Sequence, residues 1–300
     1  VEKGAKVMAK ITDDIKERSK LTKEEWREYT KTVWSIANVS HREHPAIFPV
    51  EIPHRLTKLF SFWGETVLDP FGGTGSTAVA ALRLGRNAIC VEQNEPYTRV
   101  ARQRVSEEVP EPLQNALSIV NTDCRDLSFL PDDSVDLIVT SPPYWNKADY
   151  GKSQQDLGAV DSYADFLNEM RKVIAECMRV LKPGRKMCVV TANVNQHTDH
   201  GLLTFPLSVD LATSMRDAGM VMINEIIWSK DGTGGRWGSA NGQRPIFGSY
   251  PYPPNLLFKN VHEYIIIFAK PAITKTKGAK VRAYSELMMS AQCPTLQAAE

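Results

Sequence analysis

Two short segments contain residues whose types and spacing could do chemistry, and the first is the glycine-rich turn VLDPFGGTGST (67–77). Gly72, Gly73 and Gly75 would let the backbone adopt unusual dihedral angles and pass close to a ligand. The N–H groups at the start of a following helix can bind an anionic group. The turn fits neither the G-x-G-x-x-G pattern of dinucleotide sites nor a P-loop. It favours an adenosine-bearing ligand other than a nicotinamide cofactor, and the alternative is a tight turn that binds nothing.

The second segment, DLIVTSPPYW (136–145), ends an apolar run with Ser141, Pro142, Pro143 and Tyr144. Two prolines fix the backbone and lack N–H groups, so the loop can present the serine hydroxyl and its carbonyl oxygens as acceptors. Acceptors that hold both N–H groups of an aromatic amine would favour a pyramidal nitrogen and direct its lone pair toward a sulfonium methyl. The Tyr144 ring could stack on a base that has left the duplex. The alternative is a proline turn with a packed tyrosine.

Two acidic residues end expected strands that follow the glycine turn. Glu92 could accept hydrogen bonds from ribose hydroxyls, as an acid in this place does in dinucleotide sites. Asp123 ends the next strand and could face an adenine ring. Ligands of parallel sheets bind outside the carboxyl ends of the strands. We therefore expect these acids, the glycine turn and the Ser-Pro-Pro-Tyr loop to lie at one edge of a sheet.

Apolar strands that alternate with helices must position these groups. We expect strands at 65–71, 87–93, 117–123, 136–142, 186–194, 221–230 and 263–270, and helices at 22–36, 54–62, 76–85, 95–109, 163–184 and 208–219. This alternation predicts an α/β fold, namely a Rossmann-like, doubly wound and mostly parallel sheet with helices on both faces. Residues 231–258 interrupt the pattern with glycines, prolines and aromatic residues, which is typical of a functional or mobile segment.

Composition narrows the class of protein. The formal net charge is +1, so any contact with nucleic acid must depend on local basic patches. No apolar run approaches the roughly 20 residues of a membrane helix, and the charged N-terminus lacks a signal core. The five cysteines are scattered, which favours a reducing compartment, and we expect a cytoplasmic protein. His41 and His44 have no Cys, Asp or Glu set to complete a metal site, so we expect no metal.

Several segments together match a known family. They are HPAIFPVEIPHRL (44–56), the glycine turn, the Ser-Pro-Pro-Tyr loop, RVLKPG (179–184), INEIIWSK (223–230) and HEYIIIFAK (262–270). Over most of residues 22–270 the chain resembles the S-adenosylmethionine-dependent DNA amino-methyltransferases, which modify N4 of cytosine or N6 of adenine. The His-Pro-Ala-x-Phe-Pro form is similar to that of the beta group. The cofactor half precedes the catalytic half, however, and this order is associated with the gamma group.

The resemblance implies a role for each matched position. The residues implied to hold S-adenosyl-L-methionine are Ala46, Phe48, Asp69, Phe71, Gly73, Thr74, Gly75, Ser76, Glu92 and Asp123. Of these, Glu92 would bind the ribose and Asp123 the adenine, while Ser141, Pro142, Pro143 and Tyr144 would form the amine site. Serine at the first of these four positions goes more often with cytosine in this family. We therefore expect N4-methylcytosine as the product, with N6-methyladenine as the alternative.

The substrate implied by the resemblance is double-stranded DNA with base flipping, in the setting of restriction-modification. We expect a methyltransferase domain at 22–230 plus 259–270, a target-recognition loop at 231–258, and flanking segments at 1–21 and 271–300. Candidate DNA-binding residues in the loop are Arg236, Trp237, Asn241, Gln243 and Arg244. Arginine suits guanine, and asparagine or glutamine suits adenine. The alternatives are a plain surface loop, methylation of RNA or of a protein glutamine, and a catalytically silent nucleic-acid-binding module.

Overall fold

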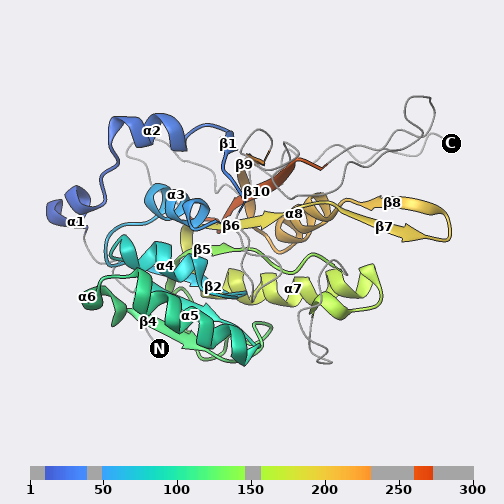
Figure 1. Ribbon diagram of the computed structural model, residues 1–300, viewed down its shortest axis with the longest axis horizontal. Coiled ribbons are helices and arrows are strands. Elements are labelled where there is room, and N and C mark those ends of the chain that lie inside the picture. Colours follow the sequence, from blue (N-terminus) through green and yellow to red (C-terminus); the bar gives the residue numbers. More distant parts are fainter. Residues whose placement is uncertain (1–10, 39–48, 146–156, 231–259, 273–300) are drawn as a thin grey trace.

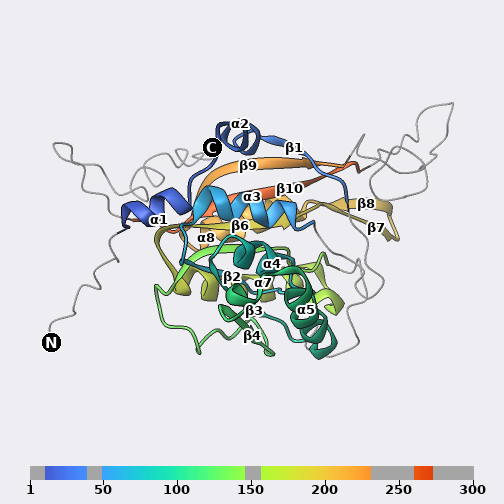
Figure 2. The same cartoon turned by 60° about the vertical axis from the view of Figure 1, so that its left-hand side comes forward.

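The computed structural model describes residues 11–38, 49–145, 157–230 and 260–272, and its centre is an eight-stranded sheet (Figure 1). In spatial order the strands are β1 (Val33–Ser35), β9 (Val221–Ser229), β10 (His262–Ala269), β6 (Leu181–Thr191), β5 (Val135–Thr140), β2 (Thr66–Asp69), β3 (Asn87–Val91) and β4 (Leu117–Val120). Figure 2 shows this order from β9 near the top to β4 near the bottom. All neighbours are parallel except β10, which is antiparallel to both β6 and β9.

Helices cover both faces of this sheet. The helices of the described residues are α1 (Asp13–Arg18), α2 (Lys23–Tyr29), α3 (Glu51–Phe60), α4 (Ser76–Arg83), α5 (Glu95–Glu108), α6 (Glu111–Gln114), α7 (Tyr163–Val180) and α8 (Leu207–Asp217), with a 3₁₀ turn at Leu157–Ala159. Strand β5 is buried along its whole length, and its side chains alternate between two cores. Ile138 packs with α7 and α8, whereas Leu137 and Val139 pack with α3, α4 and α5. The predicted α/β, mostly parallel and doubly wound fold is confirmed.

The chain order makes a topological switch point between β2 and β5. From β2 the chain continues outward through β3 and β4, and it then returns to β5 on the other side of β2. At such a switch point the loops after the two central strands diverge to opposite faces, which leaves room for a ligand outside their carboxyl ends. The glycine turn follows β2 and the Ser-Pro-Pro-Tyr loop follows β5, so the topology brings both to this point.

The predicted helix at 22–36 is wrong in its second half. Helix α2 ends at Tyr29, and Val33–Ser35 form β1, which pairs in parallel with β9. The reason is tertiary packing: the Trp34 side chain is 1% exposed in the core, whereas Trp26 is 61% exposed. Likewise the helix predicted at 163–184 ends at Val180, because Leu181 turns into an extended conformation and begins β6.

A hairpin of β7 (Val194–Thr198) and β8 (Gly201–Phe205) was not predicted, and it projects beyond the sheet in Figure 1. Among the helices of the described residues, none combines the length and the apolar character needed to cross a membrane.

Candidate active site

The Asp69 carboxylate joins the two loops that the sequence singled out. Its Oδ2 accepts a hydrogen bond from Thr77 Oγ1 at 2.7 Å, at the start of α4. Its Oδ1 accepts from Thr140 Oγ1 at 2.7 Å, at the end of β5, and from the Phe71 N–H at 3.0 Å. The side chain is 1% exposed, and burial raises its pKa to about 6 despite these donors. Asp69 therefore holds the glycine turn to the end of β5 through hydrogen bonds.

The glycine turn itself is built by positive backbone angles and close packing. Gly73 has φ 49° and Gly75 has φ 84°, a region that side-chain-bearing residues rarely occupy. A Cβ atom on Gly72 would lie 2.8 Å from the Cβ of Cys90. Gly73 is half-buried, whereas Gly72 and Gly75 are buried, so the backbone of the turn reaches the surface at Gly73.

An arginine that the sequence did not point to supports the same turn. Arg104 on α5 donates from Nη1 to the Thr74 carbonyl oxygen at 3.0 Å and to Ser76 Oγ at 3.3 Å. Both Thr74 and Ser76 are buried, with their side chains directed at the protein. What these two residues can offer a ligand is backbone N–H groups, because the first N–H groups of a helix have no acceptor within it.

Glu92 lies directly after β3 and touches the turn. Its Oε2 accepts a hydrogen bond from the Gly73 N–H at 2.8 Å, and its Oε1 accepts from the Asn94 N–H at 2.8 Å. The sequence predicted that this acid and the turn would share an edge, and the structure brings them into contact.

Asp123 lies three residues beyond the end of β4 and is half-exposed. Arg125 donates to both of its carboxylate oxygens and also donates from Nη1 to Glu169 Oε2 on α7 at 2.6 Å. Burial opposes ionisation of Asp123, but the hydrogen bonds from Arg125 outweigh it and hold the pKa of this carboxyl below its usual range. Arg125 was missed in the sequence, although it stands two positions from the acid it orients.

The Ser-Pro-Pro-Tyr loop is anchored at both ends. Thr140 binds Asp69 on one side, as described above, while Trp145 is buried on the other. Trp145 Nε1 donates to the Val160 carbonyl oxygen at 2.8 Å, and its ring lies 4.8 Å from that of Phe205. Between these anchors Pro142 is buried, and Ser141, Pro143 and Tyr144 are half-buried. The loop is therefore fixed while three of its four predicted residues remain accessible.

Tyr144 contacts an ion pair that sequence reasoning missed. Its hydroxyl donates to Glu263 Oε2 at 2.8 Å, and Glu263 Oε1 accepts from the Lys230 ammonium group. Glu263 belongs to β10, and Lys230 follows β9. The sequence held only part of this signal: a lysine ends INEIIWSK, and a glutamate stands near the start of HEYIIIFAK, before an apolar run.

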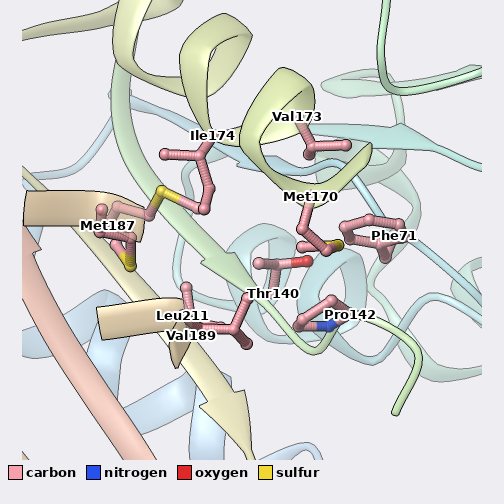
Figure 3. A pocket seen from close by; sticks show the side chains of 10 residues that line it. Phe71, Thr140, Pro142, Met170, Val173, Ile174, Met187, Val189 and Leu211 are labelled. Atoms are coloured by element: carbon pink, nitrogen blue, oxygen red, sulfur yellow. The ribbon is translucent and has the colours of Figure 1, made fainter. Parts of the chain in front are cut away.

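A small apolar cavity lies behind the two loops (Figure 3). Phe71, Thr140 and Pro142 line it from the loops, and side chains of α7, β6 and α8 such as Met170, Val189 and Leu211 complete it. A nucleoside needs polar partners, and this cavity offers almost none. This cavity is therefore not suited to hold a nucleoside.

Some predicted residues lie outside the described residues. They are Ala46, Phe48, Arg236, Trp237, Asn241, Gln243 and Arg244. Their roles stay predictions, as do the ligand contacts of the residues described above. Within the described ranges no group of three or more His, Cys, Asp or Glu side chains is arranged to hold a metal ion.

Comparison with known proteins identifies the family to which the chain belongs. The family model of the N6/N4 methyltransferases, described as DNA methylase, matches residues 2–103 and 135–292. The chain is 41% identical over 95 residues to the type II methyltransferase M.BglI of Bacillus subtilis, covering 31% of this chain and 27% of that protein. It is 38% identical over 109 residues to M.MjaI of Methanocaldococcus jannaschii, covering 34% of this chain and 36% of that protein. The chain thus matches about a third of the length of these curated relatives.

Among solved structures, the chain is similar to a protein from Thermus thermophilus described as a DNA modification methylase and complexed with S-adenosyl-L-methionine. The identity is 32% over 51% of this chain and 55% of that chain, with a TM-score of 0.38.

Because the family match spans most of its length, the chain belongs to the N6/N4 DNA methylase family. The family resemblance inferred from the motifs is confirmed. S-adenosyl-L-methionine, the predicted cofactor, is the methyl donor of this family.

Proposed function

We propose that the chain is a site-specific DNA methyltransferase that transfers a methyl group from S-adenosyl-L-methionine to the exocyclic N4 of cytosine in double-stranded DNA. The observation that carries the proposal is the Asp69 carboxylate, which ties the glycine turn to the Ser-Pro-Pro-Tyr loop. A donor held at one loop and an amine held at the other would meet above the ends of β2 and β5. The similarity to type II methyltransferases supports DNA as the substrate and restriction-modification as the setting.

The described residues fit an adenosine-bearing cofactor. The first N–H groups of α4 would hold the methionine carboxylate. Glu92 would accept from the ribose hydroxyls and Asp123 would face the adenine, each oriented by contacts already made within the protein. When bound, S-adenosyl-L-methionine supplies an electrophilic methyl group on a sulfonium centre.

The Ser-Pro-Pro-Tyr loop would hold the amine. The Ser141 hydroxyl and the carbonyl oxygens of the loop accept from the two N–H groups of the exocyclic nitrogen, and they stabilise the positive charge that develops there. Because Asp69 and Trp145 fix the two ends of the loop, these acceptors need no rearrangement during the reaction. The base must leave the duplex to reach them, and the half-buried Tyr144 ring is available to stack on it.

Cytosine is the proposed base because Ser141 is neutral and can both donate and accept. N4 of cytosine lies beside the N3 acceptor, and a hydroxyl can serve both atoms without a buried carboxylate. Adenine presents a similar pair at N6 and N1, so N6-methylation is the second candidate. Residues 231–258 are proposed to read the target sequence, and residues 22–230 with 259–270 to form the catalytic domain.

Mass spectrometry of nucleosides tests the proposal directly. Unmethylated duplex DNA is incubated with the full chain and S-adenosyl-L-methionine, with RNA and protein substrates in parallel, and Ser141→Ala as the control. N4-methylcytosine that depends on Ser141 is the expected product. N6-methyladenine alone would overturn the base assignment and keep the amine mechanism. Formation of 5-methylcytosine would refute the mechanism, because methylation of carbon needs a nucleophile that this loop lacks.

A further inference from the structure

Two residues from separate parts of the chain, Tyr144 and Lys230, meet at Glu263. Each oxygen of this carboxylate has a partner: the Lys230 ammonium group binds Oε1, and the Tyr144 hydroxyl donates to Oε2 at 2.8 Å. The antiparallel register of β9 and β10 sets Glu263 opposite Trp228, and Lys230 follows Trp228 by two positions. The register of the sheet therefore places the Lys230–Glu263 ion pair beside Tyr144, the last residue of the Ser-Pro-Pro-Tyr loop.

This pair is costly to bury. The Lys230 side chain is 4% exposed and the Glu263 side chain is 13% exposed. The free energy needed to remove two charges from water offsets much of the free energy of their attraction. A pair of apolar side chains would therefore stabilise the fold at least as well. Its contact with the Tyr144 hydroxyl explains the pair better than a contribution to the stability of the fold does.

The pair is also rigidly supported from behind. The Lys230 ammonium group lies 4.2 Å from the centre of the Trp228 ring, and Trp228 Nε1 donates to the Ile36 carbonyl oxygen at 2.8 Å. Trp228 is buried and cannot change its orientation freely. A chain of contacts thus runs from the core through Lys230 and Glu263 to the Tyr144 hydroxyl.

From this chain of contacts we infer that Glu263 and Lys230 are positioning residues for methyl transfer, which fix the Tyr144 ring in the orientation that receives the flipped base. The inference rests on the proposed function, because it assigns Tyr144 to the amine site. It also sets the expectation for Tyr144→Phe. If stacking needed the ring alone, loss of the hydroxyl would be mild, but here the hydroxyl sets the angle of the ring.

A double-mutant cycle on the full chain tests this coupling. Glu263→Gln keeps the shape and removes the charge, whereas Tyr144→Phe keeps the ring and removes the donor. We expect each to lower the single-turnover methylation rate on duplex DNA by roughly 10-fold, the size associated with a hydrogen bond to a charged group. Affinity for S-adenosyl-L-methionine should not change. Because both variants act on one shared contact, which Tyr144→Phe removes and Glu263→Gln weakens, the double variant should be no slower than the slower single variant.

Glu65→Gln is the matched control. The Glu65 side chain is 14% exposed and pairs with Arg185, which is 16% exposed, at the beginning of β2 and therefore at the opposite edge of the sheet. It should alter thermal stability as much as Glu263→Gln does, and leave the methylation rate unchanged. If Glu65→Gln and Glu263→Gln lost the same share of the methylation rate, the effect of Glu263→Gln would be explained by general destabilisation. That result would overturn the inference.

A spectroscopic measurement without DNA completes the test. With 3-fluorotyrosine at position 144, the fluorine NMR signal should shift in Glu263→Gln and in Lys230→Met, and stay in place in Glu65→Gln. A fluorine signal that does not move in Glu263→Gln would overturn the inference. So would a double variant whose loss of rate equals the product of the two single losses. In either case, wild-type methylation of DNA would still support the proposed function. A wild-type chain that methylates no DNA would overturn the proposed function, and the role of Glu263 with it.

Discussion

The Asp69→Asn substitution should change how the stability of the protein depends on pH. Burial raises the pKa of the native carboxyl to about 6, although two threonine hydroxyls and a backbone N–H donate to it, and the ordinary value is 3.8. Between these two values the native state binds a proton that the unfolded chain has released. Stability from the neutral carboxyl is thus fully present below about pH 4 and lost as the pH rises to about 6.

The size of the effect follows from the shift. A difference of about 2 pKa units corresponds to about 3 kcal/mol of unfolding free energy. Asparagine stays neutral, so this part of the pH dependence disappears in the variant. The unfolding free energy of the variant should therefore rise relative to that of the wild type, by about 3 kcal/mol between about pH 4 and about pH 7.

Asparagine also fits the hydrogen bonds. Its Oδ1 can accept from Thr140 and from the Phe71 N–H, as the carboxylate does at 2.7 and 3.0 Å. Its Nδ2 can donate to Thr77 Oγ1, whose own hydrogen can turn to the Val139 carbonyl oxygen at 3.4 Å. The substitution thus removes a charge while the contacts of the turn can be kept.

Urea unfolding followed by circular dichroism at several pH values measures the effect. Asp136→Asn is the control, because Asp136 is also buried but lies 2.7 Å from the Lys182 ammonium group. Loss of that paired charge should destabilise the protein at pH 7. A constant gap between wild type and Asp69→Asn across the pH range would refute the picture of Asp69 as a buried group with a raised pKa.

Four further predictions concern the two loops and the recognition segment. Gly72→Ala should cost about 1–3 kcal/mol of stability in thermal unfolding, because its Cβ would lie 2.8 Å from the Cβ of Cys90. Glu92→Ala should weaken cofactor binding in calorimetry more than DNA binding, because the Gly73 N–H loses its acceptor. Ser141→Ala should leave cofactor affinity intact and lower the single-turnover rate. Arg244→Ala should relax sequence choice by about 1–3 kcal/mol in methylation assays with altered duplexes; an equal loss on all sequences would indicate a phosphate contact.

The fold was predictable where one local pattern decided the structure. Each buried parallel strand is an apolar run beside a helix, and β5 shows why such a run is needed, since its side chains fill both cores. Val33–Ser35 could not be assigned in this way. Three residues become a strand only because β9 supplies a neighbour and the core accepts Trp34, and both are distant in the sequence.

The sequence was sufficient to predict which loops form the candidate site. Because the carboxyl ends of parallel strands share an edge, the glycine turn, Glu92 and the Ser-Pro-Pro-Tyr loop could be expected together. What each side chain binds could not be predicted. Asp69 was expected at the cofactor, and no local pattern indicated that its oxygens also accept hydrogen bonds from Thr77 and Thr140. Glu263 depends on the register of β10 against β9, which no local pattern encodes.

The same contacts explain why the order of the two halves along the chain need not alter the chemistry. The bond from Thr140 to Asp69 joins residues 71 positions apart, and it forms because β2 and β5 are neighbours in the sheet. A chain with its catalytic half first could keep these neighbours and change only the connections between them. The order of the gamma group is therefore compatible with a cofactor segment of the beta form. Under the proposed function, the choice between cytosine and adenine would depend on what surrounds the Ser141 hydroxyl rather than on which half comes first.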